Sequence, residues 1–133
     1  MGPVEERLIY AFTRRVNTDA MIQKSPAPER FIPTPQMAAN AQKGLTLRAR
    51  FGRGGTEVGV RRARQLIARE ELDLSDVKSM YSYFARHAVD KQARRRVWGD
   101  EANPSAGYIA WLLWGGDEGQ AWAARMRAGP AHP

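Results

Sequence analysis

Residues 43–91 constrain the fold more than any other stretch, because they combine the clearest helical periodicity of the chain with its densest positive charge. Apolar residues recur there at spacings of three and four, the pattern of amphipathic helices. The stretch predicts one helix that ends near Phe51, a second helix from Glu57 to Glu70, and a third helix after a short connection. No β-strand alternation of useful length occurs anywhere in the sequence. We therefore expect an all-α fold.

Capping residues mark the ends of these helices. Thr34 followed by Pro35 predicts a helix start, with a hydroxyl cap and a proline in the first turn. The glycine-rich turn 52–56 ends that helix, and Thr56 then caps the next one. Ser75 is expected to cap the third helix. Because so few residues connect the second and third helices, we expect them to pack on each other as a helix-turn-helix or an αα-hairpin.

Each helix carries an apolar stripe that predicts its buried face. The expected inward residues are Val60, Ala63, Leu66 and Ile67 on the second helix, and Val77, Met80, Tyr81 and Phe84 on the third. Residues 103–105 predict the start of a short helix whose segment 108–114 is almost wholly apolar and contains two tryptophans. Because it is apolar on most sides, we expect this helix at the centre of the fold. A last helix follows a break at 115–117 and turns Trp122 and Met126 inward.

The chain of 133 residues has the size of one domain. Residues 34–127 form the predicted basic helical domain, a compact bundle of five to six short helices around the Trp-rich helix, and residues 128–133 a disordered tail. Residues 1–33 comprise a predicted N-terminal helix and a Pro-rich linker or arm. The apolar residues of the N-terminal helix fall on one face: Leu8, Ile9, Phe12 and Val16. This face is expected to dock either on the domain's own core or on another subunit, so it is a candidate contact for a homo-oligomer.

The composition excludes several classes of protein. The chain has no cysteine, which rules out a disulfide framework and a thiolate zinc site. No apolar run approaches the roughly 20 residues that a membrane helix needs. Glu5 and Glu6 stand where a signal peptide would carry basic residues. We therefore expect an intracellular protein with no membrane partner.

The positive charge is concentrated in one zone. The chain carries 21 Lys and Arg against 14 Asp and Glu, a net charge of +7. Residues 43–70 contain eight basic and two acidic side chains, and residues 86–96 contain five and one. A dense basic zone of this kind indicates a polyphosphate partner, of which nucleic acid is the commonest. The alternative is a basic surface that serves solubility alone.

The arginine-rich helix suits phosphates better than bases, so we expect binding to the nucleic-acid backbone, with DNA favoured over RNA. Backbone N–H groups of the turn 52–56 lead into a helix N-terminus and make a candidate anion site, with Arg50 and Arg53 beside it. The alternative is a purely structural interhelical turn. The candidate nucleic-acid contacts are Arg50, Arg53, Gly54, Gly55, Arg61, Arg62, Arg64, Lys78, Arg86, Lys91, Arg94, Arg95, Arg96 and Trp98.

Two further features have alternative interpretations. Trp98, beside the arginine run 94–96, either stacks on a base of single-stranded or bent nucleic acid or covers the core. His87 and Asp90 have the spacing of a proton-transfer pair, but no nucleophile or second histidine lies nearby, so a capping or core-edge role is expected. No metal-ligand set or nucleophile–base pair can be assembled. We expect no enzyme activity, no catalytic residue, no metal and no cofactor.

Three stretches, GLTLRARFGRGGTEVGVRRARQL, YSYFARHAVDK and PSAGYIAWLLWGGDEGQAWA, resemble in this order a small domain of unknown function encoded by tailed bacteriophages. That domain occurs as a free-standing small protein and as an appendage to head-maturation proteases and other phage proteins. The likeness covers about residues 34–127. The chain departs from it at RHAVDKQARRRVWGDEANPSAG, where the family has a more glycine-rich loop. The arginine run there is therefore read as a local addition.

The resemblance implies a phage context: DNA handling, virion assembly or takeover of a host factor, in the host cytoplasm at the nucleoid or in the virion. It carries over no catalytic or binding residue. The expected function is a non-enzymatic, phage-encoded nucleic-acid-binding module that contacts the phosphate backbone through its Arg-rich helix pair and Gly-rich turn. The alternative is a protein-interaction module, for virion assembly or for binding a host factor, whose partner is a phage or host protein.

Overall fold

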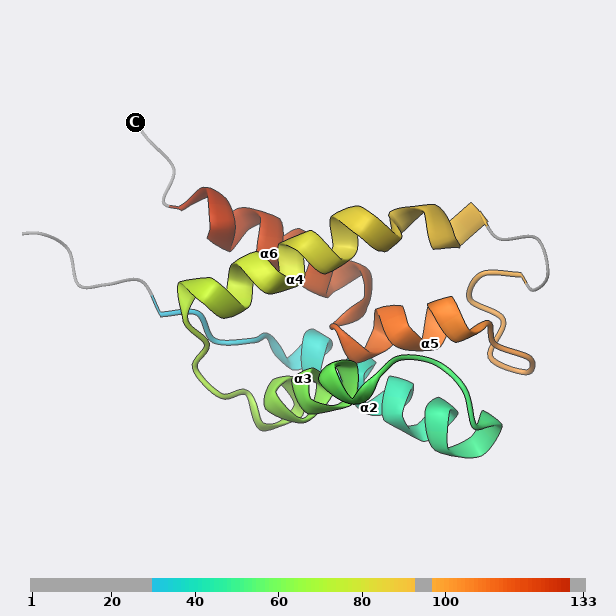
Figure 1. Ribbon diagram of the computed structural model, residues 1–133. Coiled ribbons are helices and arrows are strands. Elements are labelled where there is room, and N and C mark those ends of the chain that lie inside the picture. Colours follow the sequence, from blue (N-terminus) through green and yellow to red (C-terminus); the bar gives the residue numbers. More distant parts are fainter. Residues whose placement is uncertain (1–29, 93–96, 130–133) are drawn as a thin grey trace, which may run out of the picture.

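Five α-helices and one 3₁₀-helix make up the computed structural model of the chain, which describes residues 30–92 and 97–129 (Figure 1). In chain order they are α2 (Pro35–Phe51), α3 (Glu57–Ala68), α4 (Leu74–His87), η1 (Ala88–Gln92), α5 (Ala106–Leu113) and α6 (Gly116–Ala128). These residues contain no β-strand, only an isolated bridge between Phe31 and Leu72. The all-α prediction is confirmed.

The helices form two layers with α5 between them. Helices α2 and α3 lie on one side of α5, and α4 and α6 lie on the other (Figure 1). Helix α5 approaches every other element, whereas α3 approaches only α2 and α5. The Trp-rich helix is therefore at the centre of the bundle, as its composition predicts.

A cluster of aromatic rings joins α4 to the central helix α5. Trp111 of α5 is only 1% exposed and meets Phe84 of α4 edge to face, with the ring centroids 4.7 Å apart. Trp114, at the end of α5, stacks on Tyr83 of α4 with the centroids 4.4 Å apart and the planes 5° apart. Burying a large apolar side chain contributes roughly 1.5–3 kcal/mol. This cluster is thus a principal source of the bundle's stability.

The caps confirm most of the predicted helix starts. Three side-chain hydroxyls accept a hydrogen bond from a backbone N–H three residues later, at α2, α3 and α5 respectively: Thr34, Thr56 and Ser105. Helix α4 differs, because its N-cap is Asp73 and not Ser75. The Asp73 carboxylate accepts from the N–H of Asp76 at 2.8 Å, and the Asp76 carboxylate accepts from the N–H of Asp73 at 3.1 Å. This reciprocal capping box begins the helix before Ser75, which lies in the first turn.

The predicted packing of the second helix on the third is wrong. Helix α3 packs on α2 and α5, and α4 packs on α6. The backbones of α3 and α4 stay apart, and the side chain of Arg62 reaches across to Asp76. The connection directs the chain away from α3. Arg69 ends α3 in the left-handed region, with φ 52°, and the N–H of the buried Leu72 donates to the carbonyl of Phe31 at 2.8 Å. The pair is neither a helix-turn-helix nor an αα-hairpin.

The two tyrosines near the middle of α4 do not lie as the apolar stripe predicts. Tyr81 was expected inward and is 36% exposed, whereas Tyr83 is 6% exposed. Tyr83 is buried because α4 is covered from two sides, by α6 and by the ring of Trp114. The other predicted inward residues of α3 and α4 are buried, or half-buried for Ile67.

Several predicted segments lie outside the described residues: the N-terminal helix, most of the linker, the arginine run 94–96 and residues 130–133 of the tail. The last linker residues pack on the domain. Phe31 contacts the core, and Pro33 is buried with its carbonyl accepting from Arg69 Nε at 2.6 Å. Within residues 30–92 and 97–129, no helix combines the length and apolar character needed to cross a bilayer.

Candidate nucleic-acid interface

A groove of about 530 Å³ separates α3 from α4. Its floor is α5, whose small residues leave the space open, and its walls are the N-terminal end of α3 and one face of α4 and η1. The lining residues are Gly55, Thr56, Val58, Ser79, Tyr83, Arg86, His87, Asp90, Ala106, Gly107, Ala110 and Trp114. Those from α4 and η1 recur at three- and four-residue spacing, so they share one helical face. The groove exists because α3 and α4 do not pack together.

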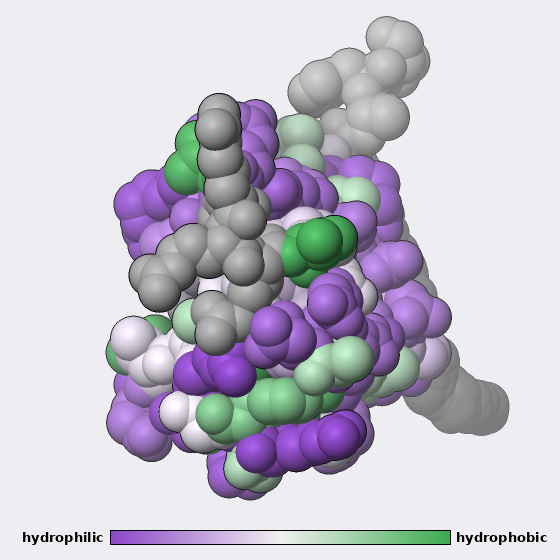
Figure 2. Space-filling view, turned by 90° about the vertical axis from the view of Figure 1, so that its right-hand side faces the viewer, coloured by the Kyte–Doolittle hydropathy of each residue, from purple (hydrophilic) through white to green (hydrophobic). Residues whose placement is uncertain are grey.

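The end of the bundle where α2 and η1 finish and α5 begins is largely hydrophilic, with apolar residues only in small separate patches (Figure 2). Two exposed valines on this part of the chain are Val89 and Val97. A surface of this character favours a polar or charged partner over an apolar one.

Four exposed cations lie on the two helices that flank the groove: Arg61 and Arg64 on α3, and Lys78 and Arg86 on α4. None of them forms an ion pair with any other described residue. Arg61 follows Val58 by one helical turn, so it continues the groove wall of α3. Arg86 lines the groove itself.

One acidic residue lines the groove, another lies in the chain between two lining residues at the start of α3, and each has a partner. Asp90 lies 3.2 Å from Nδ1 of His87, and Glu57, in the first turn of α3, lies 3.7 Å from Arg48. The partial positive charge at the N-terminus of α3 adds to the field of the arginines. Arg86 in the groove wall and the N-terminus of α3 offer positive charge to an anion there.

Tyr83 is a groove residue that the sequence pattern missed. Its hydroxyl is buried and has no hydrogen-bond partner in the described part of the chain. Burial, together with the nearby charge of Asp90, raises the pKa of Tyr83 far above the ordinary value of 10.0, so the phenol stays protonated. A stripe running through Ser79, Tyr83, Arg86 and Asp90 at helical spacing was the signal that could have found it.

Arg62 does not lie on the surface with its neighbours, which corrects the sequence prediction. It is only 9% exposed and donates to Asp76 Oδ1 at 3.0 Å and to Gln65 Oε1 at 2.8 Å. Its guanidinium also lies 5.5 Å from the centroid of the Trp114 ring. Arg62 bridges α3 to α4 across the end of the groove, so it acts as a structural residue rather than an exposed phosphate contact.

The glycine turn is explained by packing. A Cβ on Gly54 would lie 2.5 Å from Cβ of Ile109, and a Cβ on Gly55 would lie 2.6 Å from Cδ1 of Leu113. Both glycines also have positive φ, at +100° and +77°. Arg48 Nε donates to the carbonyl of Gly54 at 2.8 Å. The structural interpretation of this turn therefore accounts for its glycines without a ligand.

The two arginines beside the turn differ. Arg53 is half-buried and donates to the carbonyl of Pro104 at 2.7 Å, which ties the turn to the start of α5. Arg50 is exposed and lies over the ring of Phe51, 5.0 Å from its centroid. Arg53 also borders a small hollow of about 300 Å³ beside Gly54. Of the two, Arg50 is the freer to reach a ligand.

Lys91 and Trp98 are both used inside the fold. Lys91 Nζ lies 2.8 Å from Asp117 Oδ1 and 4.7 Å from the Trp111 ring centroid. The hydrogen bond from Lys91 holds the pKa of Asp117 below its usual value, against the opposing effect of burial. Trp98 packs edge to face on Trp111, with centroids 5.6 Å apart. Its core-covering role is therefore the one the structure shows, and the adjacent run 94–96 lies outside the described residues.

His87 and Asp90 sit at the end of α4 and in η1. The His87 ring lies against Tyr83, with centroids 4.6 Å apart, and Nδ1 meets Asp90 Oδ2 at 3.2 Å. This is the geometry of a core-edge contact. Among the described residues no group of three His, Cys, Asp or Glu side chains is placed to hold a metal ion.

Comparison with known proteins finds no match: no family model, no curated protein and no solved structure matches the chain. A function for this chain has to be argued from its own residues. Its most informative residues are the cations of α3 and α4 that form no ion pair with another described residue.

Proposed function

We propose that this protein is a non-enzymatic nucleic-acid-binding module that contacts the phosphate backbone along the exposed faces of α3 and α4. The observation that carries the proposal is the set of four cations that are exposed and unpaired among the described residues: Arg61, Arg64, Lys78 and Arg86. Arg50 extends this set at the end of α2. Arg53, Arg62 and Lys91 are left out of it because each is engaged within the fold.

Backbone contact fits these side chains better than sequence reading. Phosphate groups bind Lys and Arg whatever the base sequence, and the release of counterions from the nucleic acid drives the association. Base reading requires several hydrogen-bonding side chains on an element that enters a groove. The exposed serines of α4, Ser75, Ser79 and Ser82, are a small set for that purpose. The resemblance to a phage-encoded domain is in keeping with DNA as the nucleic acid.

The experiment is fluorescence anisotropy of labelled single-stranded and duplex DNA with the double variant Arg61→Ala/Arg64→Ala. Because both side chains are exposed, the variant should keep its fold, which circular dichroism checks. We expect its affinity at 0.1 M salt to fall on the order of tenfold or more. The matched control, Arg125→Ala/Arg127→Ala, removes the same charge from α6 and should change the affinity much less.

Equal losses of DNA affinity in the two double variants would mean that binding depends only on the net charge of the protein. That result would refute the assignment of the binding surface to α3 and α4. Absence of binding by the unaltered protein at low salt would refute the nucleic-acid proposal altogether. The basic surface would then be assigned to a protein partner of phage or host, which is the alternative function.

A further inference from the structure

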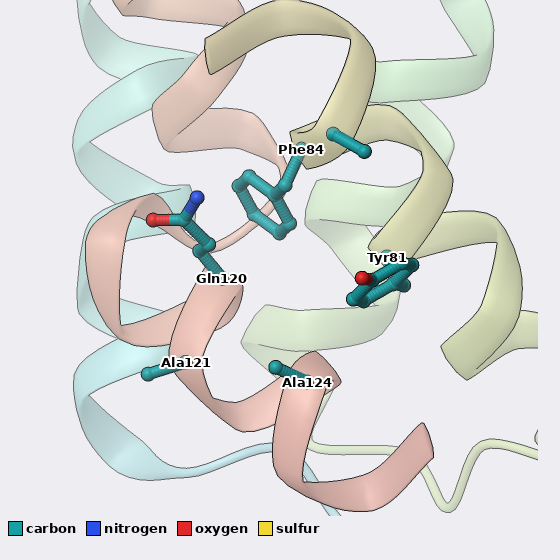
Figure 3. A pocket seen from close by; sticks show the side chains of 6 residues that line it. Tyr81, Phe84, Gln120, Ala121 and Ala124 are labelled. Atoms are coloured by element: carbon teal, nitrogen blue, oxygen red, sulfur yellow. The ribbon is translucent and has the colours of Figure 1, made fainter. Parts of the chain in front are cut away.

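A second groove, of about 370 Å³, runs between α4 and α6 and shares no lining residue with the groove between α3 and α4 (Figure 3). Helix α4 contributes Tyr81, Phe84 and Ala85, and helix α6 contributes Gln120, Ala121 and Ala124. Five of these six side chains are apolar or aromatic. The nucleic-acid proposal makes no use of this groove.

The shape of the groove suits a third helix. Its walls are two helices packed side by side, and the three alanines on its rims allow another backbone to approach closely. Tyr81 is 36% exposed at one rim although its ring is large and mostly apolar. An amphipathic helix that lays its apolar face between two others is a common recognition mode, read as anchors at i, i+3, i+4 and i+7.

The chain itself contains a segment with this pattern. Residues 3–16, outside the described part of the chain, predict an amphipathic helix whose apolar face carries Ile9, Phe12 and Val16 at i, i+3 and i+7, with Leu8 beside them. We propose that this face docks in the groove between α4 and α6 of the same chain. The proposal is independent of nucleic-acid binding.

Residues 17–29, which link the segment to the described chain, are long enough to let it reach the groove. The 13 residues 17–29 join the segment to Arg30 and span at most about 45 Å when extended. The described chain then passes Phe31, which is fixed by its hydrogen bond to Leu72, two residues before α4 begins. The 14 residues of α4 are only about 21 Å long. Every point along the groove is therefore within reach of the segment in cis.

The length and charge of the N-terminal segment also match those of α6, and the charges indicate the direction in which the segment would dock. A helix over 14 residues is about 21 Å long, and α6 with its 13 residues is about 20 Å long. Helix α6 ends in the basic Arg125 and Arg127, and the Arg127 guanidinium already lies over Tyr81, 4.3 Å from the ring centroid. The segment begins with Glu5 and Glu6. Antiparallel docking on α6 brings these carboxylates to the basic end and aligns the two helix dipoles favourably.

The absence of cysteine allows a direct test in the full chain. Ala121→Cys places one thiol on the exposed rim of the groove, and its rate of reaction with a bulky maleimide reports whether the groove is covered. We expect the additional changes Leu8→Asp/Phe12→Asp to release the segment and speed the reaction on the order of tenfold. The matched control, Ala39→Cys on the exposed face of α2, should react at the same rate with and without them.

Two results would overturn the proposal. One is an unchanged rate at Ala121→Cys when Leu8→Asp/Phe12→Asp is added, which would mean that the segment does not cover the groove. The other is a slow rate that rises on dilution, because protection that depends on concentration comes from a second copy rather than from the same chain. Protection that is independent of concentration and lost with the two aspartates would support docking within the chain.

Discussion

Replacing Arg62 by alanine should destabilise the fold far more than replacing its neighbour Arg61. The two residues are adjacent in the sequence and chemically identical, but Arg62 is 9% exposed while Arg61 is exposed. The comparison therefore separates the structural arginine from an arginine available to a ligand.

The magnitude follows from the contacts that are lost. Arg62 donates to Asp76 and Gln65, and a hydrogen bond involving a charged group contributes about 1.5–3 kcal/mol. Its place near the Trp114 ring adds roughly 0.5–1 kcal/mol. Two features lower the total: the Asp76 side chain is 29% exposed, so water solvates it in the variant, and Arg62 Nε has no partner to lose among the described residues. We expect a loss of about 2–3 kcal/mol for Arg62→Ala and under about 0.5 kcal/mol for Arg61→Ala.

Urea denaturation followed by tryptophan fluorescence measures both variants. The pH adds a second readout, because the pKa of Asp76 is lowered: burial raises it, but hydrogen bonds from the Asp73 backbone and from Arg62 outweigh that effect. Because the pKa of Asp76 is lower in the folded state, its ionised carboxylate stabilises the fold at pH values above the unfolded pKa of 3.8. This stabilisation is lost as the pH falls through the folded-state pKa. The difference between the unaltered protein and Arg62→Ala should therefore narrow below about pH 3.8. Equal losses for Arg62→Ala and Arg61→Ala would refute the bridging role.

Three further substitutions test the packing. Gly54→Ala should lower the free energy of unfolding by about 3 kcal/mol, because the new Cβ would meet Ile109 and the φ of Gly54 is positive. Gly52 also has a positive φ but faces open space, so Gly52→Ala should lower it by only about 1 kcal/mol in the same urea assay. Tyr83→Phe removes a buried hydroxyl without a described partner and should raise the free energy of unfolding by roughly 1 kcal/mol; a clear loss would show that the hydroxyl is satisfied. Burial and the hydrogen bond to Glu101 raise the pKa of Tyr108 from 10.0 to about 12. The protonated phenol therefore stabilises the fold below pH 10, and this contribution is lost as the pH rises from 10 to about 12. Tyr108→Phe should make the free energy of unfolding fall less steeply over this pH range.

The helices and their caps could be predicted from the sequence because they depend on local chemistry. Thr34, Thr56 and Ser105 cap helices where a hydroxyl precedes a periodic apolar stretch, and the apolar composition of α5 predicts its central position. The start of α4 was missed by two residues because Asp73 offers a capping box that competes with Ser75. Local signals of similar strength cannot be ranked without the contacts around them.

The packing between helices could not be predicted, because it depends on residues far apart in the chain. A short connection predicts that α3 and α4 pack together, but a hydrogen bond from Leu72 to Phe31 fixes the connection, and a groove lies between the two helices. Arg62 was placed outside by residue type, although its position three after Gly59 and four before Leu66 puts it on the buried stripe. Among the basic residues of the candidate site, Arg50, Arg61, Arg64, Lys78 and Arg86 are exposed, and the proposal depends on these side chains.

The most direct test of the central claim is the salt dependence of DNA binding by the full chain, measured as the slope of log K against log salt concentration. Each phosphate contact contributes about 0.9 to the slope for duplex DNA. We predict a steep negative slope that becomes shallower by about two units in Arg61→Ala/Arg64→Ala and stays unchanged in Arg125→Ala/Arg127→Ala. Affinity that does not change between low and moderate salt would contradict the account.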